Sequence, residues 1–248
     1  MSGIPEAISS GGYPEPIART AARARQWHRQ YLDAIMQRDV IDIANVRDKD
    51  NLSRLMSMLA YRTANLLNIS SLSGDLGIDR QTTEKYVGIL EKLFLDRRLP
   101  AWHSNRGKRL VRTPKIHVVD SGLAATLNRL TIDDWRSQST EFGPLLESFA
   151  VQQLIAQAGW VDNDLAFSYY RDKDKVEVDL VIEQGRKVWG VEVKRAATLQ
   201  KKDGAGLARL ASQAGKNFQG GILLYAGTHC LPLATSRCFA VPLNKLWT

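Results

Sequence analysis

The sequence has few cysteines and no long apolar run. Cys230 and Cys238 are its only cysteines, so they cannot form a disulfide framework, and without a CxxC pair no zinc site is expected. No apolar stretch reaches about 18 residues, which predicts no membrane span and no membrane partner. Residues 1–16 lack the charged-then-apolar order of an export signal. We therefore expect a protein of the reducing cytoplasm.

A nucleotide-binding loop is also absent. The chain contains no GxxxxGK[ST] pattern, the glycine-rich loop that cradles the phosphates of ATP. We therefore expect no ATP site and no ATPase activity from this chain.

Positive charge is in excess and is unevenly placed. The chain has 34 Lys and Arg against 26 Asp and Glu, a net charge of +8. The segment from Arg97 to Val119 contains basic residues and no acid. Such a stripe attracts phosphate polyanions, and its binding should weaken with salt. The charge alone leaves open a solvated basic loop as the alternative.

The N-terminal half has the pattern of a helical domain. Residues 1–16 carry Gly11-Gly12 and two prolines, which predicts an irregular lead-in. Apolar spacing predicts helices from Ile17 to Asn45 and from Leu52 to Leu67. We expect residues 17–136 to form a helical and winged-helix domain.

A helix-turn-helix is predicted inside this domain. A helix over residues 69–76 ends at Gly77, and Asp79 caps a second helix from Arg80 to Leu95. Two strands, 99–102 and 115–119, joined by a basic tip would complete a winged helix. In a DNA-binding winged helix the second helix reaches bases and the wing reaches phosphates. The expected nucleic-acid contacts are Arg80, Thr82, Thr83, Lys85, Arg106, Lys108 and Arg109. A winged helix used only for packing or protein contacts is the alternative.

The C-terminal half, residues 137–248, has the pattern of an α/β domain. Residues 131–141 are polar and predict a connector, and Pro144 opens a helix that runs to Ala158. Strands are expected at 165–171, 176–183, 187–194, 220–225 and 238–241, with a helix over 201–215. The predicted fold class is therefore α/β (α+β), with a mixed central sheet in the second domain.

Acidic residues recur on two of these strands. Side chains two residues apart share a face of a strand, so Glu177 and Asp179 should point the same way, as should Glu192 and Lys194. Glu147, on the preceding apolar helix, can add a third carboxylate.

Converging carboxylates favour a hard divalent cation. Mg²⁺ needs only one or two carboxylates together with water and phosphate, so we expect Glu147, Asp179 and Glu192 as metal ligands. Lys194 would orient a metal-bound water or offset phosphate charge, and Arg171 could contact the phosphate. An ion-pair network on a solvated sheet face is the alternative.

Three short motifs resemble the PD-(D/E)xK nuclease superfamily. They are GPLLE ending at Glu147, EVD ending at Asp179 and EVK ending at Lys194. Segments at 38–42, 66–69, 108–112, 119–123 and 221–225 add a resemblance to the C-terminal half of prokaryotic AAA-type ATP-binding proteins. That resemblance covers about residues 11–248, and residues 11–16 are similar to the end of the ATPase domain missing here.

The resemblance implies a winged helix followed by a restriction-endonuclease-like domain of unknown function. It implies a DNA-interacting protein with a Mg-dependent phosphodiesterase site, in which Glu147, Asp179, Glu192 and Lys194 are catalytic. The alternative is a non-catalytic regulatory module that binds DNA or protein, left from an AAA-type ATP-binding protein. DNA is the expected partner, together with an ATPase subunit or another protein.

Overall fold

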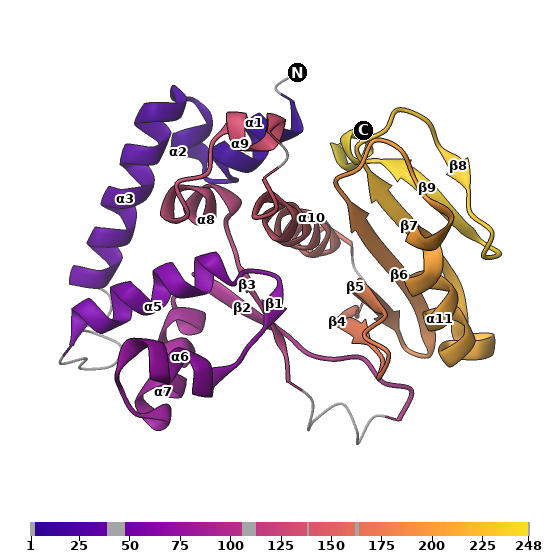
Figure 1. Ribbon diagram of the computed structural model, residues 1–248, viewed down its shortest axis with the longest axis horizontal. Helices are drawn as coiled ribbons and strands as arrows, with labels where there is room; N and C mark the ends of the chain where they lie inside the picture. The colour runs from indigo at the N-terminus through magenta and orange to yellow at the C-terminus, as the bar shows by residue number, and fades with distance from the viewer. Residues whose placement is uncertain (1–2, 39–47, 106–112, 138, 162–163, 248) are drawn as a thin grey trace. The chain divides into compact units, whose positions relative to one another are not determined.

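Two structural units divide the chain in a computed structural model that describes residues 3–38, 48–105, 113–137, 139–161 and 164–247 (Figure 1). The first unit comprises Met1–Arg98 and Lys115–Phe149, and the second comprises Leu99–Pro114 and Ala150–Thr248. The segment after Leu99 joins the second unit because Trp102 donates a backbone hydrogen bond to Tyr169, which donates one to Pro100 (2.6 and 2.9 Å).

The first unit begins with packed helices, so the prediction of an irregular lead-in is wrong. Helices α1 (Ile4–Ser10) and α2 (Pro14–Ile17) occupy it, and α3 (Ala21–Gln37), α5 (Lys49–Tyr61), α8 (Ser121–Leu127) and α9 (Ile132–Arg136) follow. The N–H of Gly12 donates to the carboxylate of Asp120 (2.7 Å), which ties the lead-in to the start of α8. The expected helix over 17–45 begins later, at Ala21, and residues 39–47 lie outside the described part of the chain.

Both helices predicted for the helix-turn-helix are present, and each begins at a capping residue. Helix α6 (Ile69–Leu76) ends at Gly77, whose positive φ of 71° suits a residue without a side chain, and Asp79 caps α7 (Arg80–Lys92). Strands β1 (Asn65–Leu66), β2 (Asp96–Leu99) and β3 (Lys115–Val118) form a sheet in the order β1-β3-β2. The strand expected at 99–102 therefore lies earlier, and β1 replaces the end of a predicted helix.

The second unit contains the expected mixed sheet, which has six strands because β8 (Leu231–Pro232) adds one to the five that were predicted. Its other strands are β4 (Ala166–Arg171), β5 (Glu177–Gln184), β6 (Lys187–Lys194), β7 (Phe218–Tyr225) and β9 (Cys238–Pro242). Their order is β4-β5-β6-β7-β9-β8, with parallel pairing at β6–β7 and β7–β9 and antiparallel pairing elsewhere. The helical segments are α10 (Phe142–Ala158), which starts in the first unit, η2 (Lys201–Gly204), α11 (Ala205–Ala214), η3 (Gly215–Asn217) and η4 (Leu243–Trp247).

Helix α11 packs on one face of this sheet (Figure 1). Its Leu207 and Leu210 lie so close to Gly190 of β6 that a Cβ atom there would be 2.7 and 2.8 Å from them. The apolar core of the second unit forms beneath this helix. In the described part of the chain, none of the helices has the length and apolar character needed to cross a bilayer.

Candidate functional site

A β-bulge interrupts the pairing of β4 with β5 next to Asp179. Ser168 pairs with Val181 and Tyr170 with Val178, so Tyr169 faces two residues of β5, Asp179 and Leu180. The pairing of β5 with β6 extends only to Leu180 and Val191. Bulges of this kind redirect side chains next to functional sites.

The carboxylate of Asp179 lies where β5 separates from β6. It accepts a hydrogen bond from the N–H of Val193 on β6 (2.8 Å). Simple alternation predicted that Glu177 and Asp179 share a face opposite Val178. The bulge interrupts that alternation. As a result Val178 and Val181, which are three residues apart, both enter the core beneath α11. The sequence pattern could not predict this, because it carries no information on pairing register.

Glu192 and Lys194 lie next to this carboxylate on β6. The Lys194 ammonium donates to Oε1 of Glu192 (2.7 Å), and both Glu192 and Asp179 are only 6% exposed. Burial by itself lowers the pKa of Lys194, but the carboxylates of Glu192, Asp179 and Asp203 act more strongly, and the net pKa is raised. The ammonium of Lys194 is therefore fixed in its charged form beside these carboxylates, and the structure brings Asp179, Glu192 and Lys194 together.

The start of α11 covers Glu192. A Cβ atom at Gly206 would lie 2.6 Å from Oε2 of Glu192 and even closer to the backbone oxygen of Glu177. Only glycine lets the helix approach the strand ends at this point. Asp203, one turn earlier, was missed by sequence reasoning, although the capping pair Gln200 and Asp203 at the start of a helix was a readable signal.

Two other expected members of the site have ion-pair partners of their own. Arg171 contacts Glu177 (2.5 Å), so the guanidinium is neutralised locally. Glu147 accepts from the buried Lys115 (2.7 Å) within the first unit, and its role as a third metal ligand stays a prediction. Among the described residues, no three His, Cys, Asp or Glu side chains form a group that could hold a metal, so a metal here would rely on two carboxylates.

The helix-turn-helix presents only part of the expected contact set. Arg80 and Lys85 are exposed on α7, whereas the hydroxyl of Thr82 donates to the carboxylate of Asp79 (2.6 Å). Thr83 is fully buried and donates to the Asp79 carbonyl (3.0 Å), so the prediction that it contacts nucleic acid is wrong. The expected wing contacts Arg106, Lys108 and Arg109 lie outside the described residues.

Comparison with known proteins places two domains on the chain. Residues 1–134 match the model of a domain of unknown function (DUF8612), and residues 142–246 match that of a second (DUF4143). The chain is 28% identical over 241 residues to the uncharacterized proteins Rv2008c of Mycobacterium tuberculosis and Mb2031c of Mycobacterium bovis. The alignment covers 96% of this chain and 52% of each relative, so the chain spans about half the length of these relatives. Since the first model covers more than half of the residues, the chain belongs to the DUF8612 family.

Proposed function

We propose that the second unit binds a divalent cation at Asp179 and Glu192 and hydrolyses phosphodiester bonds of DNA. The observation that carries this is the meeting of two nearly inaccessible carboxylates and one ammonium at the point where β5 leaves β6. The donor set fits Mg²⁺ or Mn²⁺, because such ions take carboxylate oxygens and complete their shell with water and phosphate. The resemblance of the three motifs to PD-(D/E)xK nucleases supports the same assignment.

Each residue then has a distinct task. Asp179 and Glu192 would hold the cation, which supplies a water of lowered pKa and offsets charge on phosphorus. The Val193 N–H orients Asp179 through its hydrogen bond. Lys194 cannot act as a general base, since its raised pKa keeps it protonated, so it donates to a phosphate oxygen and stabilises negative charge.

The test is cleavage of plasmid and single-stranded DNA in Mg²⁺ or Mn²⁺. Asp179→Asn and Glu192→Gln should each lower the rate at least about 100-fold, the upper end of the losses seen when outer-shell partners of a metal are changed. Asp174→Asn is the matched control, because this carboxylate lies in the same hairpin but is half-exposed and has its ion pair with Arg209 (3.4 Å). Equal cleavage by wild type and Asp179→Asn would overturn the proposal.

The first unit supports a second function, DNA binding without cleavage. Arg80 and Lys85 are exposed in the first two turns of α7, the part of a helix-turn-helix that enters the major groove. In this alternative the chain is a non-catalytic regulatory module that binds DNA, and it would act together with an ATPase partner. The double variant Arg80→Ala/Lys85→Ala should reduce the slope of log affinity against log salt by about 2, because each removed cation releases about one counterion fewer from the DNA. An unchanged slope in filter binding would exclude α7 from the interface.

A further inference from the structure

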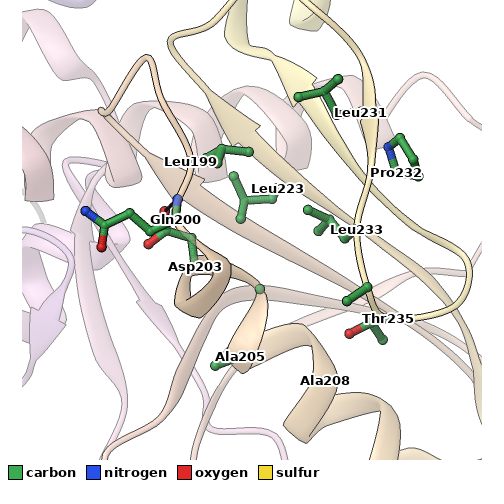
Figure 2. A pocket seen from close by; sticks show the side chains of 12 residues that line it. Leu199, Gln200, Asp203, Ala205, Ala208, Leu223, Leu231, Pro232, Leu233 and Thr235 are labelled. Carbon is green, nitrogen blue, oxygen red and sulfur yellow. Dashed lines mark hydrogen bonds between the residues drawn. The ribbon is translucent and has the colours of Figure 1, made fainter.

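A cavity of about 370 Å³ lies in the second unit between α11 and β8 (Figure 2). The start of α11 and the turn of η2 form one wall, and β8 with the residues after it forms the other. Apart from Gln200, Asp203 and Thr235, its lining side chains are aliphatic or glycine. The cavity therefore has apolar walls and a few polar groups at its edge.

The cavity is adjacent to the candidate site. Leu223, which lines it, pairs directly with Glu192 in the parallel ladder of β6 and β7. Paired residues lie on the same face of neighbouring strands, roughly 4.8 Å apart. The start of α11 belongs to both features, because Gly204 and Ala205 line the cavity and a Cβ atom at Gly206 would lie 2.6 Å from Oε2 of Glu192. A ligand that contacts Lys194 can thus extend into the cavity.

The lining indicates what kind of group fits. The described lining residues include no Lys, Arg or His, so the cavity does not itself attract phosphate. Leu231 is 45% exposed, and covering it with an apolar face would stabilise a complex. A nucleobase combines apolar faces with an edge of donors and acceptors, and carboxylates such as Asp203 accept from the exocyclic amino group of cytosine.

We propose that this cavity takes one unpaired nucleobase of the DNA strand whose phosphate contacts Lys194 and a cation held by Asp179 and Glu192. The inference rests on the proposed function and specifies its substrate class as single-stranded or frayed DNA. A base in a continuous duplex is not available to such a cavity, because it must first leave the stack.

Binding of a short fluorescent single-stranded oligodeoxynucleotide, measured by anisotropy in Ca²⁺, tests the inference. The comparison probe is a strand of the same length made of abasic residues. Wild type should bind the base-containing strand about tenfold more tightly, because the base and the aliphatic lining remove apolar surface from water when they meet. Ala208→Phe, which fills the cavity from an exposed position of α11, should remove that difference. Ser212→Phe, exposed one turn further along the helix and outside the lining, should retain it.

Asp179→Asn separates the two proposals. It should weaken both strands alike, because it acts on the phosphate rather than on the base. If wild type binds both strands equally while Asp179→Asn still weakens them, the cavity assignment fails and the phosphate site stands. If wild type binds neither strand, or Asp179→Asn changes nothing, the proposed function fails and the cavity assignment fails with it.

Discussion

Asp96 and Asp179 are both strand residues with almost no exposed surface, yet their surroundings differ. Asp179, in the second unit, accepts a backbone hydrogen bond and lies near the ammonium of Lys194. Asp96, on β2 of the first unit, has no hydrogen-bond partner for either carboxylate oxygen among the described residues. Burial, and then the charge of Glu91, raises the pKa of Asp96 to about 8 despite the opposing effect of Arg98. One unit therefore compensates a buried acid with partners, and the other compensates it by protonation.

The largest expected effect comes from removing the buried acid of the first unit. The raised pKa of Asp96 means that its contribution to stability is complete below about pH 4 and is lost as the pH rises toward 8. The loss amounts to about 1.4 kcal/mol for each pH unit. Asp96→Asn cannot ionise, so it should raise the free energy of unfolding at pH 7 by on the order of 4 kcal/mol. Urea unfolding of both proteins at pH 4.5 and pH 7.5 measures this.

The gap between Asp96→Asn and wild type should close at the acid end of that range. Asp174→Asn, which removes a half-exposed carboxylate that water screens, should change the unfolding free energy by much less at both pH values. A constant gap at both pH values would show that Asp96 does not titrate as its burial requires.

His117 should produce a slope of the opposite sign. It lies on β3 with no exposed surface, and burial, followed by the charges of Lys115 and Arg97, lowers its pKa to about 3. Its contribution is complete above pH 6.5 and is lost as the pH falls toward 3, by about 1.4 kcal/mol for each unit. Between pH 4 and 6.5 this loss offsets the gain from Asp96, so wild type should be nearly flat there as far as these two groups are concerned.

His117→Gln removes one side of that balance. In the same urea series, the variant should become more stable as the pH falls from 6.5 to 4.5, because only the Asp96 contribution remains. If the stability of His117→Gln has the same pH profile as wild type over this range, His117 is excluded as the buried base.

Local signals in the sequence predicted much of this architecture. Capping residues defined α6 and α7, and alternation with a short turn defined β5 and β6, because both signals act within a few residues. The lead-in is held against the start of α8 by the hydrogen bond from Gly12 to Asp120, 108 residues away, and no local pattern carries such a contact.

Part of the candidate site could also be predicted from local signals in the sequence. Glu192 and Lys194 lie two residues apart on one strand, so their pairing follows from strand geometry. The bulge at Asp179 depends on register between strands and was not predictable. Thr83, by contrast, could have been excluded, because it precedes Val87 by four residues and Leu90 by seven, which places it on the buried face of α7.

Gly206 tests whether the partnered acids depend on close helix packing. Gly206→Ala would place a methyl group 2.6 Å from Oε2 of Glu192 and even closer to the backbone oxygen of Glu177, so α11 must move away from the strand ends. We expect a loss of about 1–3 kcal/mol in unfolding free energy together with weaker Mn²⁺ binding in calorimetry. Gly204→Ala is the matched control, since its nearest neighbour, Leu233, would lie at an ordinary 3.8 Å. Similar behaviour of the two variants would mean that the approach of α11 does not constrain Glu192.

The smallest effect belongs to the ion pair of Arg171 and Glu177, whose side chains are 30% and 27% exposed. Water screens such a pair, and exposed pairs contribute about 0.2–1 kcal/mol, so Arg171→Gln should change the unfolding free energy by about 0.5 kcal/mol. Raising the salt concentration should reduce even this difference.

If Arg171 instead contacts phosphate, Arg171→Gln would weaken binding of single-stranded DNA, whereas Glu177→Gln would strengthen it by freeing the guanidinium. Anisotropy titrations of both variants distinguish these outcomes, because a purely structural pair predicts the same small change from either side.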